Sequence, residues 1–490
     1  MDASLELLRL YWAPAVSALH VVAALAASGH ALLSKRESGS TVAWLGLIWL
    51  SPGLGAVLYL LLGVNRIRRE ARSLRQQAPP LLPSVIQPTA LDAVQDLAVP
   101  PEQLPSTSLR QLAGSVSKLT RRALFGGNEI LPFWDGDSAY DAMIDAIDRA
   151  ESTVALCTYI FDDDAAGRRF AGALAGARAR GVEVRVLIDA AGVRYSRRPM
   201  DLHLRRLGVP ARRFLRTIAP WRVQFFNLRN HRKILVVDGR VAFTGGMNVR
   251  AGHAASTASA RDRVVDEHFR VVGPVASQLM RVFAIDWAFT TGEALEGDAW
   301  FPVPRAAGSV VARAIADGPD SDFEKFLGVV HGALACAQQE VLVSTPYFLP
   351  DASLLRALAT TAARGVDVQV LVPQKTNVPM VQWASRPLQV DAARRGCSVS
   401  LVPSPFAHSK LIVVDRAWML MGSANWDPRS YRLNFEVVVE IYDPDLAGAC
   451  ADRLGARIAS AQPLDADGAG RQSLTARLLG ALAGLASPYL

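Results

Sequence analysis

The stretch NLRNHRKILVVDGRVAFTGGMNV (Asn227–Val249) places a histidine two residues before a lysine, then adds an apolar run, an aspartate and a glycine pair. A second stretch, AHSKLIVVDRAWMLMGSANW (Ala407–Trp426), repeats His, Lys, Asp, Gly and Asn in the same order with little else in common. Both stretches contain the pattern H-x-K-x4-D. Two copies of one pattern in the same chain indicate an internal duplication.

A second pair of similar segments supports the duplication. RGVEVRVLI (Arg180–Ile188) is matched by RGVDVQVLV (Arg364–Val372), and each follows an alanine-rich segment. The alternation of apolar and polar residues predicts a strand in each case, and the preceding segments predict helices. The expected fold class is α/β, with two tandem repeats at about 126–300 and 301–470. Each repeat is expected to form a mixed sheet flanked by helices, and a pseudo-twofold axis should relate the two.

The N-terminal 75 residues have a different composition. Residues 10–33 are almost uncharged, and residues 41–64 carry no charge at all. A helix of 24 residues spans roughly 36 Å, which is enough to cross the hydrocarbon core of a bilayer. These two runs predict a transmembrane hairpin within residues 1–75. A pair of buried core helices and a cleaved signal peptide are the alternatives.

Charge near the hairpin predicts its orientation. The segment after the second run is rich in arginine, whereas the loop between the runs offers only Lys35 and Arg36. The positive-inside rule then places the body of the protein in the cytoplasm, with the chain crossing the membrane more than once. A proline-rich segment follows at 76–125 and predicts a linker, because proline interrupts helices and sheets. At the other end, leucines at helical spacing in residues 471–490 predict an amphipathic helix. That helix either lies in the membrane interface or packs against the second repeat.

Overall composition limits the class of partner and site. Among 490 residues there are 53 basic and 45 acidic ones, a net charge of +8 that suits an anionic partner such as phospholipid or nucleic acid. The four cysteines, Cys157, Cys336, Cys397 and Cys450, show neither CxxC spacing nor a cluster with histidine. We therefore expect neither a metal site nor disulfides, and a reducing compartment.

The repeated motif itself suggests phosphate chemistry. Residues i and i+2 of a strand face the same way, so His231 should project with Lys233, and His408 with Lys410. An imidazole can attack phosphorus while an ammonium group neutralises the nonbridging oxygens, and a second imidazole can protonate the leaving alcohol. Only six of the 53 basic residues are lysines, yet both motifs contain one. The ammonium group therefore looks selected at these positions.

Three further pairs of residues complete the candidate site. Asp238 and Asp415 end the apolar runs and are expected either to take part in the site or to form turns. Asn248 and Asn425 follow the small-residue turns TGGMN and MGSAN, where an amide can donate to phosphate. A histidine base commonly needs a carboxylate to set its tautomer, and the candidates are Asp266 and Glu436. The other histidines form no metal-ligand spacing and are expected to be structural or exposed: His20, His30, His203, His253, His268 and His331.

Taken together, these motifs resemble those of the phospholipase D superfamily, and more closely those of the bacterial cardiolipin synthases. The resemblance rests on NHRKILVVDGRVAFTGGMN, on STPYFLPD (Ser344–Asp351), on GSANWDPRSYRLNFE (Gly422–Glu436) and on YLLLGVNRIRR (Tyr59–Arg69). It covers nearly the whole chain. In that superfamily the two halves bring their motifs together at one active site.

The resemblance implies a phosphatidyl transfer between two phosphatidylglycerol molecules that yields cardiolipin and glycerol. By position, His231 matches the nucleophile and His408 the acid and base. Lys233, Lys410, Asn248 and Asn425 match the phosphate-holding residues, and Asp266 and Glu436 the carboxylates that orient the histidines. The implied setting is the bacterial inner membrane, with phosphatidylglycerol and an anionic phospholipid surface as partners. No cofactor, metal or nucleic acid is implied.

Two departures and three alternatives remain at this level. Where many synthases have a Glu-Tyr-Tyr run, this chain has LCTYIF with Cys157 and Thr158, and an insertion occupies Arg250–Val265. A phospholipase D that transfers the phosphatidyl group to water would carry the same motifs. A phosphodiesterase acting on nucleic acid would hardly need two membrane spans, and complete motifs in both halves argue against a non-catalytic scaffold.

Overall fold

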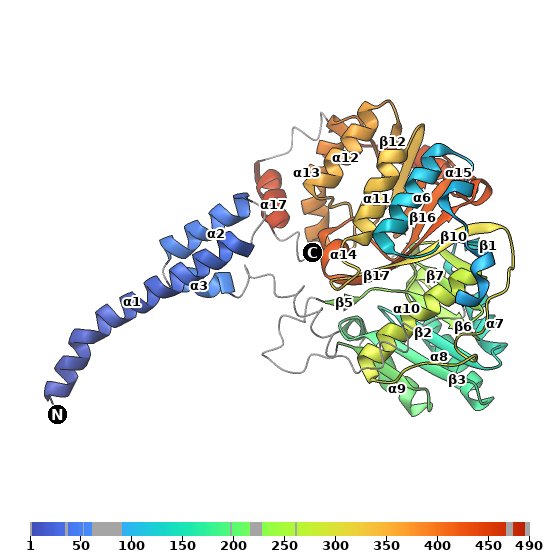
Figure 1. Ribbon diagram of the computed structural model, residues 1–490, viewed down its shortest axis with the longest axis horizontal. Coiled ribbons are helices and arrows are strands. Elements are labelled where there is room, and N and C mark those ends of the chain that lie inside the picture. The colour runs from blue at the N-terminus through green and yellow to red at the C-terminus, as the bar shows by residue number, and fades with distance from the viewer. Residues whose placement is uncertain are drawn as a thin grey trace. The chain divides into compact units, whose positions relative to one another are not determined.

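The computed structural model describes residues 2–34, 38–51, 53–60, 91–196, 198–215, 228–259, 262–466 and 474–485 (Figure 1). The chain divides into two compact units, Met1–Glu70 and Ala71–Leu490. The first unit is helical, and the second contains the sheet and both repeated motifs.

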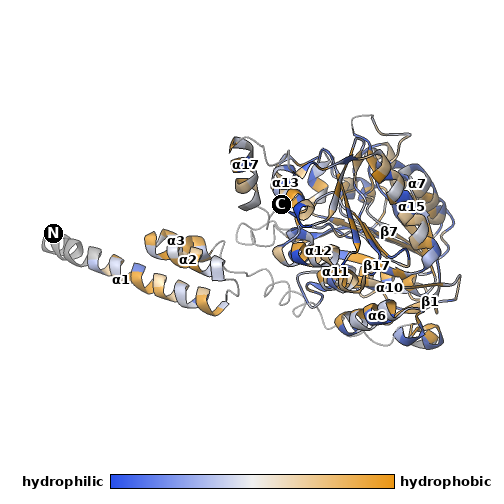
Figure 2. Ribbon diagram, turned by 90° about the horizontal axis from the view of Figure 1, so that it is seen from above, coloured by the Kyte–Doolittle hydropathy of each residue, from blue (hydrophilic) through white to orange (hydrophobic). Residues whose placement is uncertain are grey.

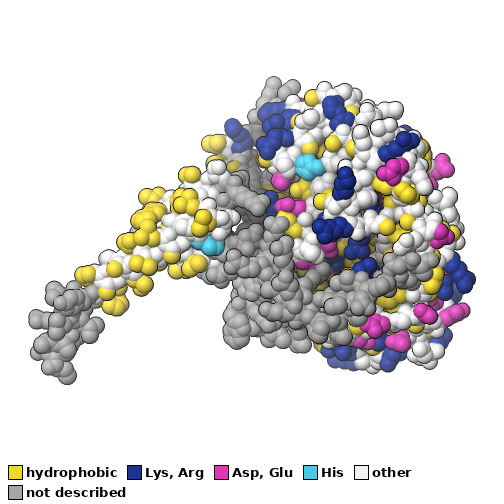
Figure 3. All heavy atoms as spheres, viewed as in Figure 1, with side chains coloured by type: hydrophobic (Ala, Val, Ile, Leu, Met, Phe, Trp, Pro, Cys, Tyr) yellow, Lys and Arg dark blue, Asp and Glu magenta, His cyan; other side chains and the backbone are white. Residues whose placement is uncertain are grey.

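Helix α1 (Asp2–Ser34) contains the first predicted span, and its part Pro14–Ser34 has a mean hydropathy of 1.7 over 21 residues. Among the described residues it is the one helix long and apolar enough to cross a membrane. Small residues on one face, Ala24, Ala27 and Ala31, pack against Ile48 and neighbouring residues. Large apolar side chains are exposed on this unit, as Figure 3 shows for one face, and the colouring of Figure 2 shows that hydrophobic residues make up much of its helices. Apolar side chains on the outside and small residues at the helix contact are typical of membrane helices.

The second predicted span, 41–64, does not form one continuous helix. Helix α2 (Ser38–Leu50) ends shortly before the proline at position 52, and α3 (Leu54–Leu58) follows. Gly53 between them has φ 81°, in the left-handed region that a helix cannot contain. Proline lacks an amide hydrogen and disfavours helix in the residue before it, which explains the break. Residues 61–64 lie outside the described part of the chain.

One sheet of sixteen strands runs through the described part of the second unit. The first half follows the order β1-β9-β7-β6-β2-β3-β4, and the second half the order β10-β17-β16-β15-β11-β12-β13-β18. The two halves join where β1 pairs antiparallel with β10. In the first half the strands are β1 (Phe125–Phe133), β2 (Thr153–Thr158), β3 (Glu183–Asp189), β4 (Ala211–Phe214), β6 (Ile234–Val237), β7 (Val241–Gly245) and β9 (His268–Val272). In the second half they are β10 (Val310–Asp317), β11 (Glu340–Ser344), β12 (Asp367–Pro373), β13 (Ser398–Val402), β15 (Leu411–Val414), β16 (Trp418–Gly422), β17 (Asn434–Tyr442) and β18 (Gln462–Pro463).

The matching strand orders confirm the mixed α/β sheet and the duplication that the sequence predicted. β2 and β3 pair in parallel, as do β11 and β12, while β6 and β15 pair antiparallel with their neighbours. The repeated segments RGVEVRVLI and RGVDVQVLV form β3 and β12, the same position in each half.

Helices cover both faces of the sheet (Figure 1). One face carries α10 (Pro274–Thr291) and α15 (Pro444–Ser460), whose apolar side chains form a core with strands of both halves. The other face carries separate cores. The helices there are α7 (Gly136–Asp148), α8 (Ala165–Ala179) and α9 (Met200–Arg206) in the first half, and α11 (Lys325–Cys336), α12 (Ala352–Ala363) and α13 (Pro379–Arg394) in the second. In β6, Ile234 and Val236 enter the shared core while Leu235 and Val237 enter the other, which explains its unbroken apolar run.

The predicted linker, 76–125, is folded in its described part. Residues 91–125 include two short 3-10 helices, η2 (Asp92–Leu97) and η3 (Pro101–Gln103), and helix α6 (Thr107–Thr120). The Ser106 side chain caps α6 by accepting a hydrogen bond from the amide of Leu109. Apolar residues of α6 are buried in the core of the second half with α11. Proline density misled the prediction because the last proline of this run, Pro105, comes just before the capped helix.

The helix predicted in 471–490 is α17 (Leu474–Leu485), and Figures 1 and 2 both show it beside α13. Residues 471–473 and 486–490 lie outside the described part of the chain.

Candidate active site

Each motif histidine is attached by its backbone to the opposite half. Strand β5 (Arg229–Asn230) pairs in parallel with β17, and the amide of His231 donates to the carbonyl of Phe435 at 2.9 Å. Strand β14 (Phe406–Ala407) pairs in the same way with β8 (Val264–Val265), and the amide of His408 donates to the carbonyl of Val265 at 2.7 Å. The histidines therefore lie in extended segments just before β6 and β15, not within those strands as expected.

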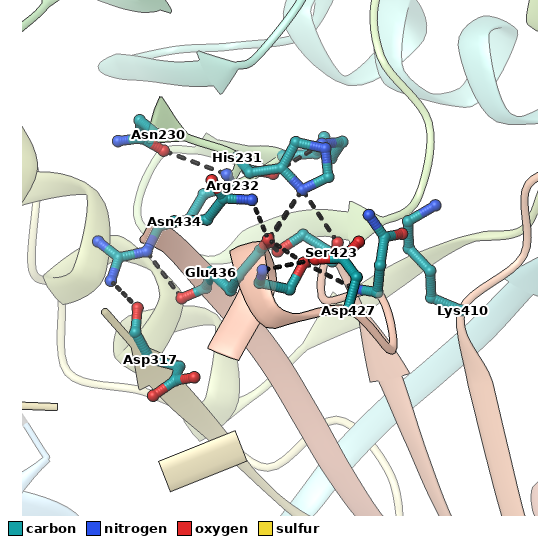
Figure 4. Close-up of polar contacts among 12 residues, drawn as sticks. Asn230, His231, Arg232, Asp317, Lys410, Ser423, Asp427, Asn434 and Glu436 are labelled. Atoms are coloured by element: carbon teal, nitrogen blue, oxygen red, sulfur yellow. Dashed lines mark hydrogen bonds and ion pairs between the residues drawn. The ribbon is translucent and has the colours of Figure 1, made fainter. Parts of the chain in front are cut away.

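This exchange of segments decides which carboxylate meets which imidazole. His231 Nδ1 lies 3.0 Å from both carboxylate oxygens of Glu436, which belongs to the second half (Figure 4). Three other side chains donate to the same carboxylate: Ser423 at 2.5 Å, Ser430 at 3.0 Å and Asn434 at 3.0 Å. Burial opposes ionisation of Glu436, yet the imidazole and Lys233 hold its pKa below the ordinary value. An ionised Glu436 accepts from Nδ1–H and leaves the Nε2 lone pair of His231 free to react.

The second pair mirrors the first, with fewer donors. His408 Nδ1 lies 2.6 Å from Oδ2 of Asp266, which belongs to the first half. The other Asp266 oxygen accepts from the backbone amide of Glu267 at 2.9 Å. Burial raises the pKa of Asp266, and burial together with Lys410 lowers the pKa of His408 well below its ordinary value. The sequence had identified both carboxylates; their crossed pairing comes from the structure.

Both motif lysines are buried beside their histidines. Lys233 Nζ donates to the carbonyl of His231 at 2.6 Å, and Lys410 Nζ donates to the carbonyl of His408 at 2.6 Å. Lys410 Nζ also lies 3.0 and 3.2 Å from the two ring nitrogens of His408. Burial lowers the pKa of Lys233 to about 7 and that of Lys410 to about 8, although Glu436 and Asp266 oppose the shifts. A bound phosphate anion would favour the charged ammonium form of both lysines.

The difference between the turns TGG and MGS follows from the two carboxylates. Gly246 lies against Asp266 so closely that a Cβ atom would come within 2.3 Å of its carboxylate oxygen. The corresponding residue of the second half, Ser423, instead donates its hydroxyl to Glu436. Glycine is therefore required at 246 to admit Asp266, whereas the longer glutamate leaves room for a hydroxyl at 423.

Asn248 and Asn425 are both buried close to these groups. The Asn248 side-chain oxygen accepts from the amide of Ile160 at 3.2 Å, which fixes the loop after β2. The side-chain oxygen of Asn425 is buried without a hydrogen-bond partner. Both asparagines are thus buried at the site, and their role in holding a phosphate stays a prediction.

The two motif aspartates have another kind of environment. Asp238 accepts from the amides of Glu151, Ser152 and Thr153, and Asp415 accepts from those of Gln338, Gln339 and Glu340. Both aspartates have φ 51° and follow the strands at the end away from the histidines. These contacts correspond to the turn-forming role, one of the two that the sequence left open.

An aromatic ring flanks each imidazole, which the motifs had not indicated. The ring of Tyr159 lies 5.1 Å from that of His231, and the ring of Tyr347 lies 6.5 Å from that of His408. The departure at Cys157 and Thr158 has a limited effect, because both are buried in β2 and the Thr158 hydroxyl donates to the carbonyl of Ile160. The following residue, Tyr159, is the one beside the histidine.

The insertion Arg250–Val265 contributes a further imidazole. His253, expected to be structural or exposed, is buried with its ring 5.9 Å from that of His408. It occupies the place that Ser430 has in the other half. His253 lies five residues after Asn248 and Ser430 five residues after Asn425, and each side chain accepts a hydrogen bond from the backbone amide of that asparagine. The equal spacing from the asparagine could have shown in the sequence that His253 and Ser430 are equivalent, but one is a histidine and the other a serine. Residues 260 and 261 of the insertion lie outside the described part.

Residue 232, between His231 and Lys233, connects the site to helix α10. Arg232 pairs with Asp286 at 2.6 Å, and both side chains are buried. Its Nε also donates to the carbonyl of Glu436 at 2.9 Å. The second half has Ser409 at this position, and Arg457 of α15 donates to its hydroxyl at 2.7 Å. Each motif is thereby anchored to the helix packed behind it. In the first half the arginine belongs to the motif, as Arg232, and in the second half it belongs to the helix, as Arg457.

Among the described residues, no group of three or more His, Cys, Asp and Glu side chains is placed to hold a metal ion. The four cysteines are free thiols.

The chain is similar to known proteins over most of its length. A family model described as "Cardiolipin synthase, PLD-like domain" matches residues 143–287 and 331–457, and one described as "Phospholipase_D-nuclease N-terminal" matches residues 22–63. A cardiolipin synthase A of Pseudomonas fluorescens is 31% identical over 480 residues, covering 97% of this chain and 98% of that protein. A cardiolipin synthase of Geobacillus thermodenitrificans is 29% identical over 466 residues, covering 94% and 90%.

A solved structure supports the fold. The phosphatidylserine synthase of Haemophilus influenzae aligns with a TM-score of 0.58 and 14% identity, covering 74% of this chain and 95% of that one. At this identity the similarity concerns the fold alone. The matches along the sequence, the duplicated sheet and the paired motifs agree, and the chain belongs to the cardiolipin synthase family of the phospholipase D superfamily.

Proposed function

We propose that this protein is a cardiolipin synthase, a phosphatidyltransferase that joins two phosphatidylglycerol molecules and releases glycerol. The observation that carries the proposal is the pair of crossed histidine–carboxylate contacts, each with a buried lysine beside it. One such pair can supply a nucleophile and the other an acid and base.

In the first step Nε2 of His231 attacks the phosphorus of one phosphatidylglycerol. The phosphorus–oxygen bond to the headgroup glycerol breaks, and that oxygen takes the proton from Nε2 of His408. Burial lowers the pKa of His408 in the free enzyme, and the bound phosphodiester anion opposes this shift by favouring the protonated imidazole. The products are free glycerol and a phosphatidyl group on His231. Lys233 and Lys410 offset the negative charge that the nonbridging oxygens carry in the transition state.

In the second step a headgroup hydroxyl of another phosphatidylglycerol gives its proton to His408. Its oxygen attacks the phosphorus, and the phosphorus–nitrogen bond breaks. Cardiolipin leaves, and both imidazoles return to their starting states. No other reactant is consumed, because the new phosphate ester replaces the one that was broken.

The assignment of the nucleophile rests on the surroundings of the two carboxylates. Glu436 is held by four side-chain donors and its pKa is lowered, so it remains an anion and increases electron density on His231. The pKa of Asp266 is raised, which makes its support of His408 weaker. His408 is therefore better suited to exchange protons than to form the covalent bond.

The proposed setting follows from the N-terminal unit. Helix α1 can cross a bilayer, and membrane association agrees with phospholipid substrates. We place the second unit on the cytoplasmic side of the bacterial inner membrane, because the arginines after position 64 outnumber the basic residues of the preceding loop. Crossing more than once is part of this proposal.

The test is to incubate the purified protein in bilayers with labelled phosphatidylglycerol alone. Thin-layer chromatography should show cardiolipin and glycerol in equal amounts. Phosphatidic acid with glycerol would identify a hydrolase instead, because water would then be the acceptor. A His231→Ala variant serves as the control for contaminating enzymes. Cleavage of single-stranded nucleic acid in a parallel reaction would support the phosphodiesterase alternative.

A further inference from the structure

An exposed apolar surface lies on helices α13 and α17. It consists of Val378, just before α13, Met380 and Trp383 of α13, and Leu474, Leu478 and Leu482 of α17. Trp383 is 45% exposed, and the three leucines are 69%, 54% and 63% exposed. We refer to these six residues as the α13–α17 surface.

The contact between the two helices explains why the leucines point outward. Gly480 of α17 lies against the backbone of Trp383, where a Cβ atom would come within 3.2 Å of its carbonyl oxygen. Ala483 is buried with Val381 and Ala384 of α13. Helix α17 thus packs against the second half through its small residues and leaves its leucine face uncovered. A surface helix of a soluble domain normally buries its large apolar side chains, so this face is suited to an apolar medium.

The surface continues into the active site through Tyr347. Tyr347 packs against the cluster that contains Ala483 and Val381, and its ring lies 6.5 Å from that of His408. Its hydroxyl donates to Asn377 at 2.7 Å, the residue directly before Val378. A single tyrosine therefore joins the exposed apolar surface to the second imidazole.

Charge around the surface has one sign. The charged residues within 374–390 and 474–485 are Lys375, Arg386 and Arg477, and neither segment contains an acidic residue. Lys375 and Arg477 are exposed, and Arg386 is partly exposed. Apolar side chains bordered by basic ones, with a tryptophan among them, are typical of a surface that enters the headgroup region of an anionic bilayer.

We propose that the α13–α17 surface inserts into the interface of an anionic phospholipid bilayer and brings the His408 side of the active site to its lipid substrate. This proposal depends on the proposed function in one respect, which is that the substrate is a lipid held in a bilayer. A second copy of the chain is the other occupant considered, and the tests below distinguish it.

The first test measures where the leucine face lies, independently of catalysis. An environment-sensitive fluorophore is attached to Leu478→Cys in the full-length protein, in a Cys336→Ser background because Cys336 is the one partly exposed thiol among the four. The protein is reconstituted into vesicles of phosphatidylglycerol and phosphatidylcholine containing nitroxide-labelled lipid. We expect strong quenching at position 478. The matched control, Leu202→Cys, lies on a residue that is 44% exposed on α9 and should be quenched little.

Equal quenching at positions 478 and 202 would refute the proposal. Emission that depends on protein concentration but not on nitroxide lipid would show that a second copy covers the surface, and would also refute it. Neither result depends on which reaction the enzyme catalyses, so failure here leaves the proposed function untouched.

The second test compares two forms of the substrate. The triple variant Leu474→Ser, Leu478→Ser and Leu482→Ser should raise KM for long-chain phosphatidylglycerol in vesicles at least about tenfold. The reason is that the variant loses three apolar side chains that the proposal buries in the bilayer. Its kcat/KM for a short-chain, monomeric phosphatidylglycerol should stay within about twofold. The control variant Leu131→Ser, Leu202→Ser and Leu207→Ser removes three other partly exposed leucines, at 47%, 44% and 42%, and should behave as the wild type. Equal loss on both substrate forms would show that the leucines serve the fold and not the bilayer.

Discussion

At the scale of single residues, the active site combines groups that are unstable when buried alone. Lys233 and Lys410 lie in an environment that favours their neutral forms, and Glu436 and Asp266 offset this only in part. A bound phosphodiester would supply the missing negative charge. The site is therefore organised for an anionic substrate and not for its own stability.

Replacing either histidine should abolish turnover. His231→Ala and His408→Ala should each lower kcat by at least about a thousandfold, because nucleophile and acid act as a unit. Circular dichroism and melting temperature should remain close to those of the wild type. A covalent phosphatidyl adduct, trapped by rapid quenching and located by mass spectrometry, should be found on His231. An adduct on His408 would reverse the two roles, and activity within tenfold of wild type in either variant would contradict the mechanism.

The lysines predict a distinctive pH dependence. The pKa of Lys233 is about 7 and that of Lys410 about 8, so kcat/KM should fall as the pH rises through this range, where the free enzyme loses its ammonium charge. A bound phosphate anion favours the ammonium form, so kcat should fall only at a higher pH. The acidic limb should lie below pH 6.5, because burial lowers the pKa of His231 from that value.

Lysine-to-arginine variants check this interpretation. Lys410→Arg keeps its positive charge at every accessible pH, so its alkaline limb should follow the one remaining lysine, Lys233, alone. Its rate should still be at least about tenfold lower, because a planar guanidinium does not fit the space of a compact ammonium. A wild-type kcat/KM that stays constant up to pH 9.5 would show that the lysines do not lose their protons in this range.

At the scale of secondary structure, each catalytic segment depends on the helix behind it. Arg232 connects the segment before β6 to Asp286 of α10 and to the backbone of β17 at Glu436. Ser409 and Arg457 make the corresponding connection to α15. The two helices share one core, so the anchoring of both motifs is supported by the same packed layer.

Removing this anchor should destabilise the protein and misplace Glu436. Arg232→Ala should lower the free energy of unfolding by about 3–5 kcal/mol, because it removes the positive charge that pairs with the buried Asp286 carboxylate. The matched control is Arg149→Ala, whose pair with Asp145 is exposed at 78% and 54% and should change stability by about 0–1 kcal/mol. Chemical denaturation in detergent measures both. Similar effects from the two variants would mean that the Arg232 pair is not the anchor.

At the scale of the whole molecule, neither half contains a complete site. His231 of the first half is oriented by Glu436 of the second, and His408 of the second half by Asp266 of the first. The pairings of β5 with β17 and of β14 with β8 hold this exchange in place. The duplicated chain thus forms one active site from two incomplete ones.

The exchange makes a prediction that spectroscopy can check. In protein with nitrogen-15-labelled histidine, Glu436→Gln should shift the ring signals of His231 strongly and those of His408 little. Asp266→Asn should do the reverse. These changes follow because the carboxylate sets the tautomer of the imidazole it contacts. The crossed pairing would be contradicted if Glu436→Gln shifted only the signals of His408 and Asp266→Asn only those of His231.

The sequence by itself determined the duplication, the strand pattern and the choice of candidate catalytic side chains. His231, His408 and the two lysines were evident because the motif is local and occurs twice, and β3 and β12 were evident because burial imposes a repeat on apolar residues. It misjudged residues 91–125 as a linker, because the proline content of a segment does not show whether that segment packs against another part of the chain.

Only the tertiary structure decided which groups meet. The crossed carboxylates, the burial of His253 beside His408 and the packing of α17 through its small face all join residues far apart in the chain. A sequence pattern shows that a side chain needs a partner of a given kind, because burial of charge or apolar surface requires one. The identity of that partner depends on which surfaces the fold brings together, and that is a property of the packed chain as a whole.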